Sequence, residues 1–175
     1  MNSVFYQEGF SVPPKSKMQI DSITQFIRAA NPDLINKDGA IDVLALLEIK
    51  YGKYHIIPDH EMKGILGLTL PSGDILLRQS VYDGACDGNG RDRFTIAHEI
   101  AHAIMHKEHI GLARPVEKST KIFCNAEWQA NEFAGRLLLP DNYIELYKGS
   151  SVGDIAEMFG ISYECAQIRI NKYKK

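Results

Sequence analysis

The sequence is poor in cysteine, has no long apolar run and carries no excess of positive charge. Its three cysteines, Cys86, Cys124 and Cys165, are odd in number and far apart, and no two form a C-x-x-C pair. This spacing argues against a disulfide framework and against a cysteine-rich zinc site. We find no stretch apolar enough to cross a membrane and expect no signal peptide. We therefore expect a cytoplasmic protein with reduced thiols.

The nearly balanced charge excludes a further class of function. A net charge of −2 provides no basic field, so nonspecific attraction to nucleic acids or membranes is not the main activity of the fold. The length of 175 residues and the hydrophobic content of 45% suit one domain of ordinary size with a real core. We expect no membrane partner and no direct DNA binding.

Hydrophobic spacing predicts two helices followed by a short β region. Apolar residues recur at helical spacing over residues 20–30, and Asp38 can cap a second helix. Residues 54–57, 64–70 and 74–79 then have the pattern of short strands, the last two joined as a hairpin. These segments predict a small antiparallel sheet, which serves either as scaffold or as an edge for an extended substrate.

The most informative stretch is FTIAHEIAHAIMH, residues 94–106. His98 and His102 are four residues apart, so on a helix they stand on one face and can hold one metal ion, with Glu99 beside it. This is the H-E-x-x-H pattern of zinc hydrolases. The alternative is a partly exposed polar helix face, since so short a motif arises by chance with a probability of roughly 1% in such a chain.

A catalytic zinc site usually needs a third protein ligand. His106 would lie about 9 Å along the helix axis from a metal held by the first two histidines, too far to bind it. His109, His55 and His60 have no helpful spacing, and we interpret all four as ordinary histidines. Cys86 lies in the glycine-containing segment 80–90, which we expect to be a loop, and is better explained as a plain loop cysteine than as a ligand.

The missing ligand is better sought in NAEWQANEFAGRLLLP, residues 125–140, which has the pattern of a second helix. Glu127 and Asn131 share one face at i and i+4, and small residues near them allow another helix to approach. Glu127 would complete the metal site, and Asn131 would orient a ligand histidine. Glu132, rotated by about 140° from Glu127, should face solvent. The alternative for Glu127 is a surface carboxylate.

Together, RDRFTIAHEIAH (residues 91–102) and EWQANEFAGRLLLP (residues 127–140) resemble the ImmA/IrrE family of zinc-dependent metallopeptidases. The resemblance implies a gluzincin-type site in which His98, His102 and Glu127 bind Zn²⁺ and Glu99 is the general base. Ala101 stands where many members have Gly, and Leu139 where many have Met. Neither difference affects a proposed ligand.

The resemblance also implies a partner. Members of the family are often encoded beside helix-turn-helix repressors on mobile genetic elements, and they cleave or inactivate these repressors. A protein substrate of that kind, with relief of repression as the result, is therefore what the resemblance implies for this chain.

The C-terminal residues 151–175 have the pattern of two short helices joined by a tight turn, similar to a helix-turn-helix. The second of these helices begins with Glu164 and has few side chains that would contact bases. We therefore expect a helical hairpin that packs on a zincin-like domain formed by residues 1–150, and that serves packing or a protein partner.

These observations combine into one expected architecture and two alternative functions. We expect an α+β, zincin-like domain with a small antiparallel sheet, a metal-site helix pair and the C-terminal helical hairpin. The favoured function is a zinc metalloendopeptidase, in which Tyr143 or Tyr147 could stabilise the oxyanion. The alternative is a non-proteolytic regulator that binds its repressor stoichiometrically, with zinc in a structural or sensing role.

Overall fold

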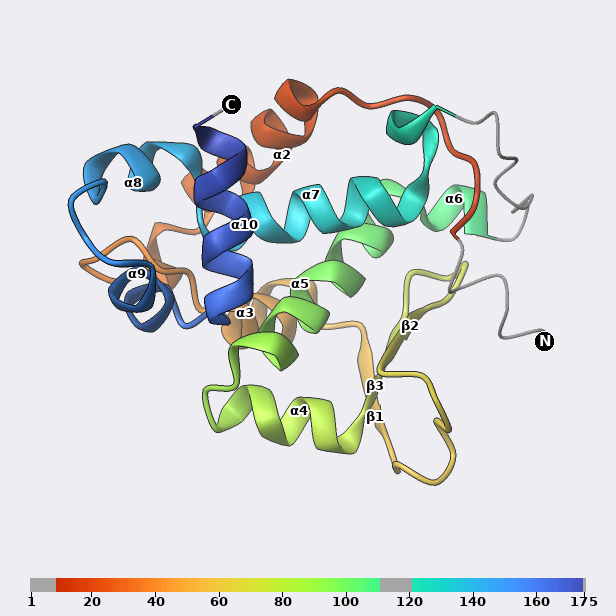
Figure 1. The fold of residues 1–175 in the computed structure, drawn as a ribbon. Coiled ribbons are helices and arrows are strands. Elements are labelled where there is room, and N and C mark those ends of the chain that lie inside the picture. Colours follow the sequence, from red (N-terminus) through yellow and green to blue (C-terminus); the bar gives the residue numbers. More distant parts are fainter. Residues whose placement is uncertain (1–8, 111–120, 175) are drawn as a thin grey trace.

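Two helices, α5 (Gly90–Met105) and α7 (Ala126–Leu138), pack against each other at the centre of the molecule (Figure 1). The structure is a computed structural model that describes residues 9–110 and 121–174. Each central helix begins at an asparagine whose side chain accepts backbone N–H groups of the first turn, Asn89 for α5 and Asn125 for α7. Fully buried alanines in both helices permit their close approach.

The other helical elements surround this pair. They are α2 (Lys17–Ala30), η1 (Pro32–Leu34), α3 (Val43–Ala45), η2 (Leu46–Tyr51), α4 (Gln79–Cys86), α6 (Lys107–Ile110), η3 (Ile122–Cys124), α8 (Asp141–Leu146), α9 (Val152–Phe159) and α10 (Tyr163–Tyr173). Asp38 does not cap the second helical segment. Asp42 does, because its side chain accepts the N–H of Ala45, whereas Asp38 belongs to a turn closed by Asn36.

The sheet contains three strands in the order β1-β3-β2, namely β1 (Tyr54–Ile57), β2 (Gly67–Thr69) and β3 (Ile75–Arg78). β2 and β3 form the predicted antiparallel hairpin, but β1 pairs with β3 in parallel, so the sheet is mixed. The chain reverses before β2 and again after it, which returns β3 to the direction of β1. β3 then lies between the other two strands, which makes β2 an edge strand.

The predicted loop at residues 80–90 is mostly helix α4. Val81 and Ala85 are buried and anchor this helix to the core. Gly84, which suggested flexibility in the sequence, is instead a point of close approach, because a Cβ atom there would lie 2.1 Å from Oδ2 of Asp92. Helix α4 leads directly into α5, which carries the H-E-x-x-H motif.

Helices α9 and α10 meet at a tight turn in which Gly160 has a positive φ of 58°. Their apolar side chains, including Ile155, Phe159 and Ala166, belong to the same hydrophobic cluster as those of α5 and α7. Figure 1 shows α10 beside α7 and α9 beyond α10, on the side away from the sheet. In the described part of the chain, no helix is both long and apolar enough to cross a membrane.

Candidate metal centre

The structure brings His98 and His102 of α5 together with Glu127 of α7. The Nε2 atoms of the two histidines are 3.0 Å apart, and each lies 3.1 Å from a different oxygen of the Glu127 carboxylate. All three side chains are largely shielded from solvent. Their ligand atoms therefore converge on one point between the two helices.

This donor set suits a zinc ion. Two imidazole nitrogens and one carboxylate oxygen are the ligands of many hydrolytic zinc sites, in which a fourth position is left open. Donors at the usual bond lengths of about 2.0–2.1 Å in a tetrahedral site lie about 3.3 Å apart. The separations of 3.0 to 3.1 Å observed between the three side chains are close to this value.

The electrostatics of the three side chains are coupled. Burial opposes ionisation of Glu127, but the imidazoles of His102 and His98 beside the carboxylate outweigh burial and hold the pKa of the Glu127 carboxyl well below its usual 4.5. Burial also works against a charge on His98, but the hydrogen bond to Glu127 and the charge of Glu99 raise the pKa of His98 above 6.5. The carboxylate is thus held ionised, as metal binding requires.

Amide and imidazole groups contact the outward ring nitrogens of both histidines. Asn131 lies one turn after Glu127 on α7, and its Oδ1 is 3.0 Å from Nδ1 of His98. On the other side, Nδ1 of His102 is 3.0 Å from Nδ1 of His106, whose Nε2 is 2.9 Å from Oε1 of Gln129. Both histidines of the motif are therefore held at Nδ1 and present Nε2 to the centre.

His106 was interpreted from the sequence as an ordinary histidine, and the structure corrects this. It is fully buried, and burial together with the neighbouring imidazole of His102 lowers the pKa of His106 to about 3. Its distance along the helix does keep it out of the converging group, yet it contacts a member of that group. The i+4 spacing from His102 was the signal that could have indicated the contact.

Glu99 lies beside this group, and strand β2 determines its position. The hydroxyl of Thr69 donates to two oxygens of Glu99, Oε2 over 2.8 Å and the backbone oxygen over 3.0 Å. Gly67 provides the space, because a Cβ atom there would lie 2.6 Å from Cγ of Glu99. Sequence reasoning missed both residues, since they lie about thirty positions from Glu99 and only the sheet brings them to the helix.

A cavity of about 370 Å³ opens above these side chains. His98, Glu99, His102 and Glu127 line its floor, and the segment 64–69 forms one wall. The other apolar lining comes from Phe10, Phe94 and Ile110. The ring of Phe10 stacks on His102 with 6.2 Å between centroids. The cavity thus joins the proposed metal ligands to the edge strand of the sheet.

The two tyrosines suggested as oxyanion partners lie elsewhere. Tyr143 packs against Phe159, with 5.6 Å between ring centroids, and Tyr147 donates its hydroxyl to the backbone oxygen of Asp38. Neither lines the cavity. The reason is that α7 ends at Leu138, and the segment formed by α8 and the residue after it carries both side chains into the core formed with α9.

Four other polar residues discussed from the sequence, Glu132, His55, His60 and Cys86, lie outside the converging group. Glu132 is buried rather than solvated, because Lys172 of α10 and Arg136 lie against its carboxylate. His55 and His60 lie beside acidic side chains of the β region, away from the cavity. Cys86 is exposed at the end of α4.

A comparison with protein-family models matches residues 52–171 to the M78 peptidases, described as the IrrE N-terminal-like domain. The chain belongs to this family. The matched segment runs from the start of the β region into α10 and includes His98, Glu99, His102 and Glu127, so the M78 domain takes in α9 and α10 as well. No curated protein and no solved structure matches the chain. Membership in the M78 peptidases supports peptidase activity and a zincin-like α+β fold.

Proposed function

We propose that the protein is a zinc-dependent metalloendopeptidase that hydrolyses a peptide bond in a protein substrate. One observation carries the proposal: two imidazoles and a carboxylate converge at the floor of an open cavity, with a second carboxylate, Glu99, beside them. A purely structural metal site would have no use for an open cavity or for a neighbouring carboxylate.

In this proposal His98, His102 and Glu127 hold the zinc ion. The chemistry that a bound zinc ion supplies is Lewis acidity, which polarises a carbonyl and lowers the pKa of water toward ~7. Glu99 takes the proton from the attacking water and passes it to the leaving amine. Oε2 of Glu99 accepts the hydrogen bond from Thr69, which keeps the carboxylate in one orientation. Oε1 has no such partner from Thr69, and we propose that it accepts the proton of the water.

Strand β2 is the proposed docking site for the substrate backbone. It has β3 on one side, and residues 64–69 line the cavity on the way to Glu99. An extended peptide can add to such an edge through backbone hydrogen bonds. This would place a peptide carbonyl near the metal ligands, while Phe94 and Ile110 provide apolar contacts for side chains.

The proposed substrate is a helix-turn-helix repressor encoded next to the gene, and its cleavage would relieve repression. The resemblance to the ImmA/IrrE family supports this part of the proposal. The net charge of −2 supports a protein substrate over duplex DNA, because phosphate binding depends on a local excess of positive charge.

The test is incubation of the purified protein with that repressor, with and without a zinc chelator, followed by electrophoresis and mass spectrometry of fragments. The wild type should cleave, and the chelator should stop it. Glu99→Gln should keep zinc but reduce cleavage by at least ~10²-fold, because positioned acid–base groups contribute about 10²–10⁴. Glu157→Gln, which changes an exposed glutamate of α9, is the matched control and should cleave normally.

The same variant separates the peptidase from a stoichiometric regulator. A regulator that only binds its repressor keeps its partner surface in Glu99→Gln and should still relieve repression in cells. A zinc-loaded Glu99→Gln protein that does so, with no repressor fragments, would overturn the peptidase proposal.

A further inference from the structure

We propose that the buried pair His106 and Gln129 fixes the tautomer of His102, so that His102 donates from Nδ1 and keeps Nε2 for the metal. The inference rests on the proposed metal site, but it concerns the state of the chain before any metal binds. His106 and Gln129 are positioning residues, because they act only through His102.

The side-chain amide of Gln129, on α7, is fully buried and has a fixed orientation. Its side-chain nitrogen donates to the backbone oxygens of Pro13, over 2.9 Å, and of Phe123, over 2.8 Å. Both N–H groups of the amide are used in these two bonds. The positions of the amide nitrogen and the amide oxygen are therefore fixed and cannot be exchanged. Its oxygen Oε1 must then face His106, whose Nε2 is 2.9 Å away.

The orientation of Gln129 decides the tautomer of His106. An amide oxygen only accepts hydrogen bonds, so Nε2 of His106 carries the proton and donates it to Gln129. His106 is fully buried between an amide oxygen and another imidazole, and neither partner balances a positive charge, so the ring stays neutral. A neutral imidazole has one donor and one acceptor. Nδ1 of His106 is therefore the acceptor.

The tautomer of His102 follows. Its Nδ1 lies 3.0 Å from Nδ1 of His106, so His102 must donate from Nδ1. The lone pair that a metal can take is then that of Nε2, and this atom lies 3.1 Å from Oε1 of Glu127. A metal ligand needs that lone pair, and partners that hold the other ring nitrogen keep a ligand histidine in the required tautomer.

The two histidines of the motif are thus prepared in parallel ways. Asn131 holds Nδ1 of His98 directly with an amide oxygen, over 3.0 Å. Gln129 holds Nδ1 of His102 through His106, and it is itself anchored on backbone oxygens of residues 13 and 123. We call this chain of contacts from Gln129 through His106 to His102 the relay. It connects the segment before α2 and the segment before α7 to one proposed metal ligand.

The test compares His106→Phe with His106→Asn. Phenylalanine fills the space but accepts no hydrogen bond, whereas the asparagine side-chain oxygen can stand where Nδ1 was. His106→Phe should weaken zinc binding by about 10- to 100-fold, the usual effect of losing such a partner, and His106→Asn should restore most of the affinity. Zinc affinity is measured by competition with a chelator, and circular dichroism checks the fold of each variant.

A second measurement uses the metal-free wild type and needs neither zinc nor substrate. Long-range ¹H–¹⁵N correlation spectra at neutral to mildly alkaline pH should show His102 protonated at Nδ1 and His106 at Nε2. A His102 protonated at Nε2 would overturn the inference, as would a folded His106→Phe variant with wild-type affinity. A wild type that has these tautomers but binds no zinc would instead contradict the proposed function and leave the relay standing.

Discussion

Helix α7 carries two glutamates, one half-buried and one fully buried, that belong to two chemically different regions. Glu127 faces the imidazole nitrogens of α5 and an open cavity. Glu132, five residues later, faces the ammonium group of Lys172 on α10 and the guanidinium of Arg136. Both carboxyls have a lowered pKa although burial works against it in each case. The direction of the pKa shift therefore does not distinguish a metal site from a structural ion pair.

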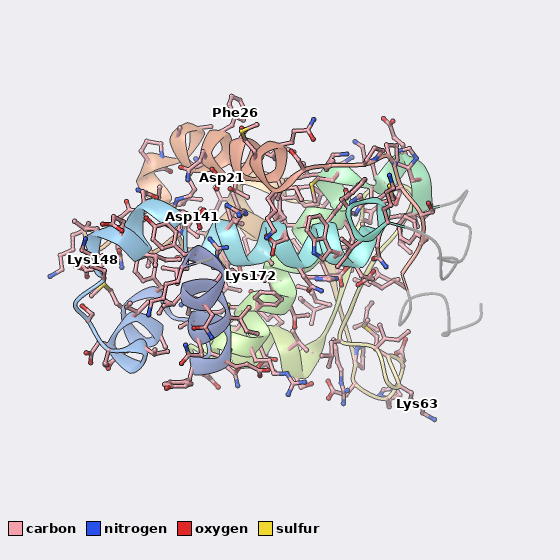
Figure 2. All side chains as sticks on the ribbon, turned by 45° about the horizontal axis from the view of Figure 1, so that its top comes forward. Asp21, Phe26, Lys63, Asp141, Lys148 and Lys172 are labelled. Carbon is pink, nitrogen blue, oxygen red and sulfur yellow. The ribbon has the colours of Figure 1, made fainter. Side chains whose placement is uncertain are left out.

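The region around Glu132 is a closed network of fixed charges. Arg136 lies 3.0 Å from Asp21 of α2 and 2.9 Å from Asp141 of α8, and Arg169 of α10 also contacts Asp141. Figure 2 labels Asp21, Asp141 and Lys172, which come from three different helices and converge beside α7. The network joins α2, α8 and α10 to the central helix, so we assign it a structural role.

The difference lies in where the positive charge comes from. Around Glu132 the chain itself supplies the cations, so the carboxylate is neutralised by its own fold. Around Glu127 the chain supplies imidazoles whose Nε2 atoms point inward, and in the proposed function a metal cation from outside completes the group. This comparison predicts that changes on one face of α7 affect metal binding and changes on the other affect stability.

The largest expected effect is that of Glu127→Gln on metal affinity. The change keeps the size of the side chain and removes its charge, so zinc affinity should fall by more than the factor of about 10 to 100 that a partner of a ligand contributes. Chelator competition measures this, with Glu157→Gln as the exposed control. Tight, stoichiometric zinc in the folded Glu127→Gln variant would show that another residue is the third ligand.

The next effect concerns Asn131, which neighbours Glu132 in sequence but contacts His98. Asn131→Ala frees Nδ1 of His98, and zinc affinity should fall by about 10- to 100-fold. The urea midpoint of the metal-free protein should change little, because Asn131 is exposed. Unaltered zinc binding would remove Asn131 from the metal centre.

Glu132→Gln should show the opposite pattern. Loss of a charged hydrogen-bonding partner in a buried site should lower the free energy of unfolding by about 1–3 kcal/mol. Zinc affinity should stay at the wild-type value, since Glu132 contacts α10 and not the metal ligands. Urea denaturation and chelator competition on the same sample measure both quantities, and a large loss of zinc affinity with intact stability would break the comparison.

The smallest expected effect is a pH dependence of the difference in unfolding free energy between the wild type and Glu132→Gln. Burial opposes the charge of Glu132, but Lys172 and Arg136 lower the pKa of Glu132 below 4.5 in the folded state. The folded state thus binds a proton less readily than the unfolded state, so this carboxylate stabilises the fold above about pH 4.3 and loses its effect as the pH falls through the lowered pKa. The difference in unfolding free energy between wild type and Glu132→Gln should therefore shrink on acidification. A constant difference down to about pH 3 would contradict the assigned cause.

Much of the candidate site could be predicted from local spacing. His98 and His102 must share a helix face at i and i+4, and the same rule places Glu127 and Asn131 on one face of the second helix. These relations hold within one helix and need no information about the rest of the chain. The β2–β3 hairpin could be predicted for the same reason, because its two strands are adjacent in sequence.

Contacts between distant segments could not be predicted in this way. The position of β3 between β1 and β2, and hence the free edge of β2, depends on strand order. The hydrogen bond from Thr69 to Glu99, the relay from Gln129 to His102 and the burial of Glu132 all join elements that are separate in sequence. A pattern of residue types shows which side chains can share a face but not which partner will cover that face.

By itself, therefore, the sequence determined the family, the two helices and the chemical identity of the converging side chains, because helix geometry is local and repeats every few residues. Only the tertiary structure decided which histidine nitrogens face inward and which residue positions Glu99. It also decided which of the two glutamates of α7 forms ion pairs with basic side chains of the same chain. These properties depend on burial and on long-range hydrogen bonds, which form when the helices and the sheet pack together.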